Sequence, residues 1–143
     1  YKDKGVPIRS RKLSMIKGIG TDLVEKRRIK NAISKFGDKF IERVLTEKEK
    51  EEYQSKASLH KKISFISNNF ACKEATSKAL GTGLTKGISL KSIEVLREDN
   101  GSPYLNLLGA AKKRADENGY EFFKLSISDT KDHSLAVVIG EGK

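Results

Sequence analysis

Two side chains of opposite charge, Glu74 and Lys78, lie one helical turn apart in the run FACKEATSKALGTGLTKG, residues 70–87. The same row of positions begins with the apolar residues Ile66 and Phe70, so charged groups stand where the helical period favours apolar ones. A carboxylate can hold a metal ion, and an ammonium can contact a phosphate. An ordinary ion pair on a solvated helix face, worth about 0.2–0.5 kcal/mol, explains the same spacing equally well.

Asp22 is a second carboxylate in a position that could support chemistry. It follows the run MIKGIG, residues 15–20, whose alternation of apolar residues with Lys or Gly predicts a short strand. Asp22 is either the N-cap of the next helix, with Glu25 at the capping-box spacing, or a metal-binding carboxylate at the strand terminus. Local evidence alone favours the cap.

Four cations stand among the five residues of KRRIK, residues 26–30, at the start of the next helical pattern. Positive charge there opposes the helix dipole, which favours anions at the N-terminal end. The cluster is therefore either a solvated face or a surface for an acidic partner.

The 143 residues carry a formal net charge of +10. Residues 1–14 have no apolar periodicity and precede the single methionine, Met15, which predicts an expression tag or vector-derived segment. Residues 15–143 are enough for one domain with a sizeable core. A basic balance suits nucleic acid, an anionic membrane or an acidic protein, and charge alone does not choose among them.

Other features of the composition narrow the class of protein. One cysteine, Cys72, cannot form an internal disulfide and reads as a small buried residue in a reducing compartment. No apolar run approaches the ~18 residues of a membrane span, and no signal-peptide core is present. Two histidines far apart argue against a histidine-rich zinc site. We therefore expect a cytoplasmic protein.

The periodicity changes from helical to strand-like after Gly87. Thr46 and Glu49 form a capping box that opens a charged helix, and the longest helix is expected over residues 59–80. Turn signals join the later strands as hairpins, which predicts a largely antiparallel sheet in one α+β domain. The later elements expected are strands over residues 88–96, 104–107, 120–128 and 134–140, and a short helix over residues 109–118.

Several segments together resemble the holo-acyl-carrier-protein synthases, the bacterial members of the 4′-phosphopantetheinyl transferase superfamily. They are GIGTDLVEKRRI, FIERVLTEKE, FACKEATSKALGTGLTKGISLKSIEV, NGSPYL and LSISDTKDHSLAVVI, in the family's order and spacing. The resemblance covers nearly everything from Met15 to Ile139, and KEATSKALGTG is a specific motif. It implies that family's fold, a largely antiparallel sheet packed against a long helix.

The resemblance also implies the reaction. An enzyme of this family transfers 4′-phosphopantetheine from coenzyme A to a serine of apo-acyl carrier protein and releases adenosine 3′,5′-bisphosphate. The family's Mg²⁺ ligands match Asp22 and Glu74. Mg²⁺ takes one or two carboxylates together with water and substrate phosphate oxygens, so this ligand pair suits pyrophosphate chemistry. Glu74, Asp22 and a metal-bound water all remain candidates for the base.

Three further groups follow from the resemblance. Lys78 would face the pyrophosphate as a catalytic residue beside Asp22 and Glu74. The positions that match the coenzyme A site are Lys78, Gly81, Thr82, Gly83, Pro103, Ser128 and Thr130. The positions that match the docking surface for the acidic carrier protein are Lys26, Arg27, Arg28 and Lys35. The family is commonly a homotrimer, with each coenzyme site shared between neighbouring subunits.

One position departs from the family pattern. Asp129 stands where the family's SxSHT segment has histidine. An aspartate near the coenzyme A phosphates should be repulsive unless Lys131, His133 or another cation offsets it.

Two alternatives come from other classes of protein. A small RNA-binding protein would interleave aromatic and basic residues on its strands, and these strands show no such pattern. A non-catalytic module that binds carrier proteins would not need the set of Asp22, Glu74 and Lys78.

Overall fold

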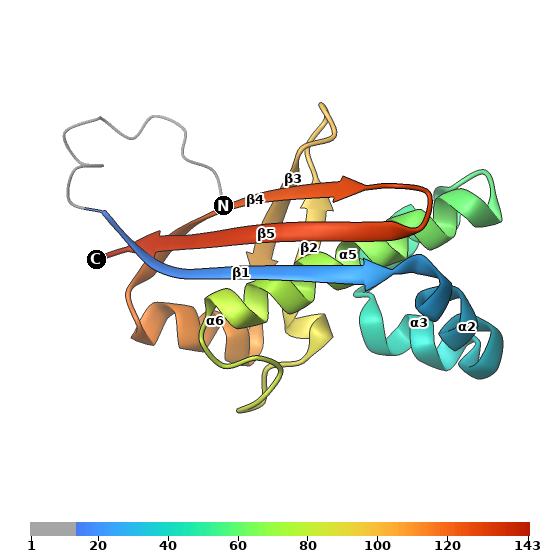
Figure 1. The fold of residues 1–143 in the computed structure, drawn as a ribbon. Helices are drawn as coiled ribbons and strands as arrows, with labels where there is room; N and C mark the ends of the chain where they lie inside the picture. Colours follow the sequence, from blue (N-terminus) through green and yellow to red (C-terminus); the bar gives the residue numbers. More distant parts are fainter. Residues whose placement is uncertain (1–13) are drawn as a thin grey trace.

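The structure is a computed structural model that describes residues 14–143, so the expected vector-derived segment, residues 1–14, lies outside the described residues except for Ser14. Figure 1 shows the arrangement of the elements. In chain order they are β1 (Met15–Glu25), α2 (Lys26–Phe36), α3 (Asp38–Val44), α4 (Glu47–Ser55), α5 (Leu59–Ala79), the 3₁₀ turn η1 (Leu90–Ser92), β2 (Ile93–Arg97), β3 (Pro103–Leu107), α6 (Gly109–Glu117), β4 (Tyr120–Asp129) and β5 (His133–Gly142).

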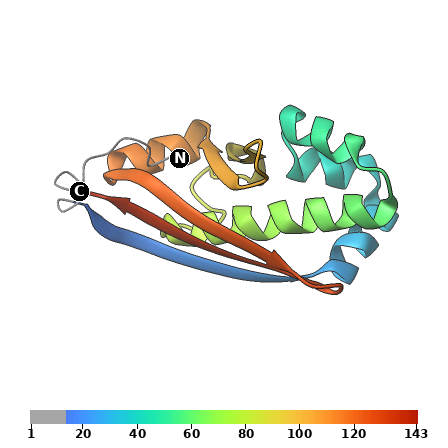
Figure 2. The same cartoon turned by 90° about the horizontal axis from the view of Figure 1, so that it is seen from above.

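Two antiparallel sheets flank the long helix α5. The larger has the strand order β1-β5-β4, and the smaller is the hairpin β2-β3. Figure 2 shows α5 lying along one face of the three-stranded sheet, with the hairpin on the other side of the helix. The expected α+β class with antiparallel pairing is confirmed. Among the helices of residues 14–143, none is long and apolar enough to cross a membrane.

The glycines of the GIG motif allow β1 to lie directly against α5. A Cβ atom on Gly20 would come within 1.8 Å of the backbone oxygen of Ala75, and one on Gly18 within 1.9 Å of that of Ala79. Real Cβ atoms essentially never approach that closely. The small residues of α5 and the glycines of β1 therefore bring the backbones of helix and strand together, which sets Asp22 close to the middle of α5.

Strand β1 is longer than the sequence pattern indicated. It continues through Asp22 to Glu25, and Asp22 lies opposite Ala136 of β5. The N-cap of α2 is Glu25, which makes no side-chain capping bond. The interpretation of Asp22 as a helix cap is therefore wrong, because the strand pairing extends past it.

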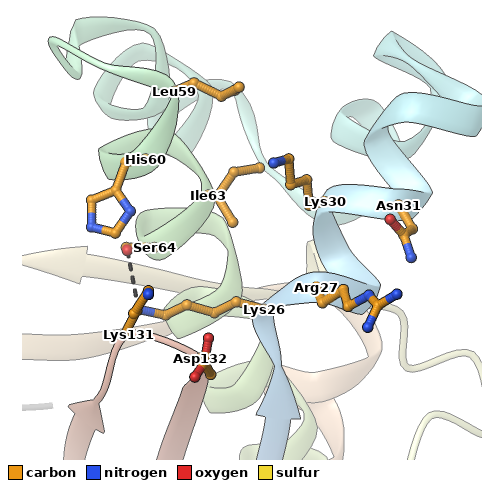
Figure 3. Close-up of a pocket in the computed structure, with 10 residues that line it drawn as sticks. All are labelled: Lys26, Arg27, Lys30, Asn31, Leu59, His60, Ile63, Ser64, Lys131 and Asp132. Atoms are coloured by element: carbon orange, nitrogen blue, oxygen red, sulfur yellow. Dashed lines mark hydrogen bonds between the residues drawn. The ribbon is translucent and has the colours of Figure 1, made fainter.

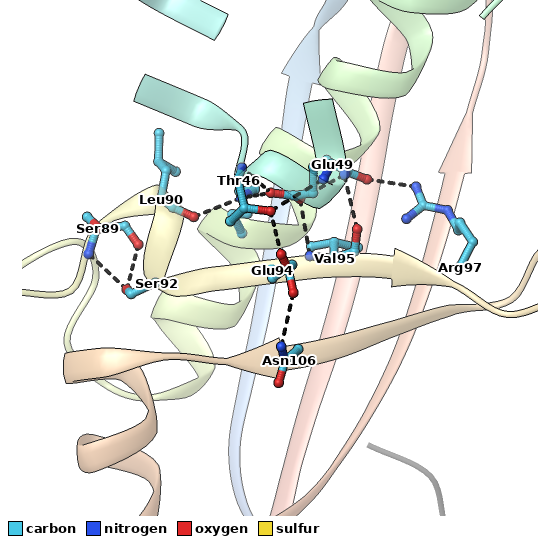
Figure 4. Close-up of polar contacts among 11 residues, drawn as sticks. Thr46, Glu49, Ser89, Leu90, Ser92, Glu94, Val95, Arg97 and Asn106 are labelled. Carbon is cyan, nitrogen blue, oxygen red and sulfur yellow. Dashed lines mark hydrogen bonds and ion pairs between the residues drawn. The ribbon is translucent and has the colours of Figure 1, made fainter. Parts of the chain in front are cut away.

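A buried ion pair holds α4 against α5. Figure 4 shows the polar contacts around Glu49, one member of this pair. Lys73 donates to Glu49 over 2.7 Å, and both side chains are completely buried. Glu49 also accepts hydrogen bonds from the backbone N–H of Thr46, from Asn69 and from the backbone N–H of Val95. The capping box of Thr46 and Glu49 is confirmed, and the same glutamate joins α4, α5 and β2.

The core also contains the only cysteine, Cys72, which is fully buried on α5. Burial raises the pKa of its thiol to about 12. The thiolate, which is the nucleophile and metal ligand, is therefore not populated near neutral pH. Cys72 acts as a packing residue, as the sequence indicated.

Candidate active site

Strand β1 and helix α5 bring Asp22, Glu74 and Lys78 together. The ammonium of Lys78 donates to Asp22 Oδ1 over 3.1 Å and to the backbone oxygen of Thr21 over 2.9 Å. An ion pair thus links residues 56 positions apart in the chain. The local spacing of Glu74 and Lys78 showed only a neighbour pair on one helix, whereas the structure adds a second carboxylate from another element.

Glu74 and Asp22 line the same cleft, and the charge of Asp22 acts on Glu74. Burial raises the pKa of Glu74, the negative charge of Asp22 raises it further, and the ammonium of Lys78 lowers it. Two carboxylates in a partly buried place repel one another, and a bound divalent cation would relieve that repulsion. Glu74 and Asp22 supply only oxygen donors, which is the chemistry that Mg²⁺ prefers.

Asp22 and Glu74 are a pair of carboxylates, without a third candidate ligand beside them in the part of the chain that the structure describes. Within residues 14–143, no group of three or more His, Cys, Asp or Glu side chains could hold a metal ion. Mg²⁺ is usually bound through one or two carboxylates, with water and substrate phosphates completing its coordination. Asp22 and Glu74 match that pattern.

A cleft of about 420 Å³ lies beside the two carboxylates. Arg28 of α2 lines it together with the aromatic residues Phe40 and Phe70. The cleft therefore combines a carboxylate pair, a cation and apolar walls. This combination suits a substrate that carries both charged and apolar parts.

The four basic residues expected at the docking surface do not share one environment. Arg28 lines the cleft of Asp22 and Glu74, and Arg27 lines a different cleft with Lys30. Lys35 is exposed at the end of α2 and lies over the ring of Phe36. The structure therefore divides the KRRIK cluster between two faces of α2.

Lys26 corrects the expected docking set. Its side chain is buried, and its ammonium donates to Asp129 Oδ2 over 2.7 Å, to the backbone oxygen of Thr130 over 2.6 Å and to Ser64 Oγ over 3.1 Å. Three bonds occupy its three hydrogens. Lys26 is therefore a buried partner of the β4–β5 turn rather than an exposed docking residue.

The same ion pair answers the question raised by Asp129. The cation that offsets its charge is Lys26, 103 positions away in the chain, rather than the neighbouring Lys131 or His133. Sequence reasoning missed this pair because no local spacing connects the two residues. The only feature of the sequence that pointed to a missing cation partner was the aspartate at the family's histidine position.

The loop after α5 has the backbone expected of its glycines. Gly81 and Gly83 have positive φ angles of 82° and 60°. The backbone N–H groups of Thr82 and Gly83 both donate to the oxygen of Ser77, which closes the end of the helix. The loop therefore turns directly beyond Lys78, where glycine permits the left-handed conformation.

The residues expected to contact coenzyme A do not form one site within this chain. Ser128 is level with Leu135 and Leu23 near one end of the large sheet, and Thr130 follows in the turn. The loop of Gly81 and Gly83 lies near the other end, because α5 ends where Ala79 meets Gly18. Pro103 opens β3 in the separate hairpin.

Comparisons with known proteins define the class. A sequence model described as the 4′-phosphopantetheinyl transferase superfamily matches residues 18–138. The chain therefore belongs to the 4′-phosphopantetheinyl transferase superfamily, and the expected enzyme class is confirmed.

Within that superfamily, the chain is similar to holo-[acyl-carrier-protein] synthases. The chain is 40% identical to the holo-[acyl-carrier-protein] synthase of Aliivibrio salmonicida, over 88% of this chain and 98% of that protein. It is 41% identical to that of Maridesulfovibrio salexigens, over 89% and 99%.

Solved structures of holo-[acyl-carrier-protein] synthases have a similar fold. The holo-[acyl-carrier-protein] synthase of Neisseria meningitidis superposes with a TM-score of 0.80 at 36% identity, over 88% of this chain and 98% of that one. A synthase from Bacillus anthracis in complex with CoA (3′,5′-ADP) gives a TM-score of 0.76 at 36% identity, over 90% and 99%.

Proposed function

We propose that this enzyme transfers 4′-phosphopantetheine from coenzyme A to a serine hydroxyl of apo-acyl carrier protein and releases adenosine 3′,5′-bisphosphate. The observation that carries the proposal is the meeting of Asp22, Glu74 and Lys78 from β1 and α5. The solved structure of a relative with coenzyme A supports the choice of co-substrate.

The metal in this proposal is Mg²⁺, held by Asp22 and Glu74. When bound, it would neutralise part of the negative charge on the pyrophosphate. Lys78 would contribute beside it, since two hydrogen bonds to Thr21 and Asp22 leave one of its three ammonium hydrogens for a phosphate oxygen. Fixed positive charge near the departing phosphate favours the transition state over the ground state.

The product of the reaction gives the test. The protein should be incubated with coenzyme A, apo-acyl carrier protein and MgCl₂, and adenosine 3′,5′-bisphosphate measured by chromatography. We expect release only when all components are present, and none in excess EDTA. Full release in EDTA would exclude the metal assignment, and no release under any condition would exclude the reaction.

Arg28, which lines the cleft of Asp22 and Glu74, is proposed to dock the acidic carrier protein. Arg28→Ala should raise KM for the carrier protein about tenfold, with kcat and KM for coenzyme A little changed, because one charged contact to a partner is worth ~1–2 kcal/mol. Steady-state kinetics with each substrate varied in turn provides the measurement.

The matched control for Arg28 is Lys113→Ala, which removes one exposed positive charge on α6. This variant should leave both KM values unchanged. Equal losses for coenzyme A and carrier protein in Arg28→Ala would contradict a docking role. Arg27 and Lys35 remain proposed as weaker contributors, since neither lines the cleft of the carboxylates.

The uncovered face of the large sheet supports a homotrimer. Ile19 and Leu23 on β1 are 63% and 65% exposed, and they pair in register with Ile139 and Leu135 of β5. Figure 2 shows that α5 covers the opposite face of this sheet, and that no element of residues 14–143 covers the face of Ile19 and Leu23. A continuous apolar strip of this kind is typical of an interface. Such an assembly would also let the β4–β5 turn of one subunit approach the glycine loop of another.

Light scattering tests this assembly. The wild-type protein should have three times the mass of the chain, whereas Ile19→Lys should be monomeric, because three lysines would be buried against apolar neighbours. Leu108→Lys, at another exposed leucine, is the control and should remain trimeric. A fully active wild-type monomer would contradict the shared site.

A further inference from the structure

Lys26 is the first residue of α2, but its side chain is only 6% exposed. Figure 3 shows it extending along the floor of a cleft of about 620 Å³ between α2, the start of α5 and the β4–β5 turn. Its backbone N–H donates to the oxygen of Asp132 over 2.8 Å, and its ammonium bonds to Asp129, Thr130 and Ser64. One residue therefore holds the turn through both its backbone N–H and its ammonium.

A net gain in stability does not by itself explain a buried lysine at this position. A cation in the first turn of a helix opposes the helix dipole, and burying a charge costs free energy that its ion pair often only balances. Apolar side chains in place of both Lys26 and Asp129 would fill the same space without the cost of burying a charge. Unlike an apolar side chain, Lys26 forms hydrogen bonds to Asp129 and Thr130 of the turn.

The turn that Lys26 holds contains Thr130. Thr130 Oγ1 accepts from the backbone N–H groups of Asp132 and His133, and the N–H of Thr130 donates to the oxygen of His133. The turn is thus internally rigid, and its hydroxyl hydrogen is not used in these bonds. The ammonium of Lys26, through the backbone oxygen of Thr130, determines where this rigid turn lies relative to the body of the protein.

Lys26 also connects that turn to the docking surface. Arg28 lies two residues further along α2, beside the catalytic carboxylates. A shift in the first turn of α2 would therefore move Arg28, and a shift in the turn would move Thr130. In addition, Lys26 neutralises Asp129, which is 37% exposed and would otherwise present an unpaired carboxylate.

We propose that Lys26 is a positioning residue that holds the β4–β5 turn in the place where Thr130 binds coenzyme A. The inference rests on the proposed function and on the assignment of Thr130 to the coenzyme A site, which the family resemblance implies. It has two separable parts: the bond to the Thr130 oxygen fixes the turn, and the bond to Asp129 removes a repulsive charge.

Lys26→Met tests the proposal, since methionine is only one heavy atom shorter than lysine and removes the charge. We expect KM for coenzyme A, and its Kd measured by calorimetry, to rise about tenfold with kcat within about twofold, as small displacements of a binding group weaken binding strongly. Asp129→Asn keeps the bonds of Lys26 to Thr130 and Ser64, and its Kd should stay within about twofold of wild type.

The double variant Lys26→Met/Asp129→Asn separates the two parts. It lacks the unpaired carboxylate but also lacks the bond to Thr130, so its Kd for coenzyme A should remain raised several-fold, at about 1 kcal/mol for one lost hydrogen bond. If the double variant returns to wild-type affinity, Lys26 acts only as a counter-charge and the positioning role is wrong. Wild-type affinity in Lys26→Met alone would overturn the proposal entirely.

A stability control and the direct binding measurement complete the test. Val95→Ala, in the buried hairpin strand β2, lowers stability far from the turn and should leave the Kd for coenzyme A unchanged. Because calorimetry needs no turnover, a wild-type protein that binds coenzyme A without transferring it would refute the proposed reaction while leaving the role of Lys26 measurable. A wild type that binds no coenzyme A would refute both.

Discussion

Glu74→Gln should reduce the rate of phosphopantetheine transfer by at least about 10³-fold, because it removes one of the two charges that would hold the cation at the pyrophosphate. The glutamine keeps the shape and one oxygen of the glutamate, so the loss would report charge rather than packing. Transfer rates at saturating MgCl₂, measured beside wild type, provide the comparison.

The same variant should not lose stability. Burial raises the pKa of Glu74, so the folded protein carries this charge at a cost at neutral pH, and that cost disappears only as the pH falls through the raised pKa. Glutamine avoids the cost, and Tm at pH 7 should be equal to wild type or higher. Glu47→Gln, an exposed glutamate on α4, is the control and should keep full activity. Near-normal turnover in Glu74→Gln would refute the metal assignment.

Lys73→Met should destabilise the fold by about 3–5 kcal/mol, because it leaves Glu49 as an uncompensated charge in the core. Burial lowers the pKa of Lys73, and the adjacent Glu49 opposes that shift, so the two groups depend on one another. Urea unfolding followed by circular dichroism gives the free energy.

Two further variants make that measurement specific. Lys113→Met removes an exposed i,i+4 partner of Glu117 and should cost about 0.5 kcal/mol or less. Lys73→Met/Glu49→Gln removes the unpaired charge and should be more stable than Lys73→Met alone. If Lys73→Met costs no more than the Lys113 control, the buried pair contributes nothing to the fold.

The adjacent charged residues Lys73 and Glu74 thus have different roles. Lys73 points into the core and binds Glu49, whereas Glu74 lines the cleft with Asp22. A helix turns 100° per residue, so neighbours in sequence face different surroundings. The sequence motif alone does not show which of the two charges is structural, because both are polar residues at helical positions.

Much of the fold was accessible from the sequence. The capping box of Thr46 and Glu49, the long helix α5 and the antiparallel hairpins all follow local patterns. The continuation of β1 past Asp22 was not accessible, since it depends on pairing with β5 more than a hundred residues away.

The site was predictable where residues share one element or one family motif. Glu74 and Lys78 stand on the same helix, and the resemblance pointed to Asp22 as their partner. The burial of Lys26 could not be predicted, because KRRIK has the composition of an exposed basic face and its partner Asp129 belongs to a distant turn. Only the tertiary structure shows that one of these cations, Lys26, is buried and paired inside the fold.

The most direct test of the central claim is the intact mass of apo-acyl carrier protein after incubation with this enzyme, coenzyme A and MgCl₂. We expect a gain of one phosphopantetheine with wild type, and no gain with Glu74→Gln or when EDTA is present. An unchanged carrier-protein mass with folded wild-type enzyme, or an equal gain with Glu74→Gln, would contradict it.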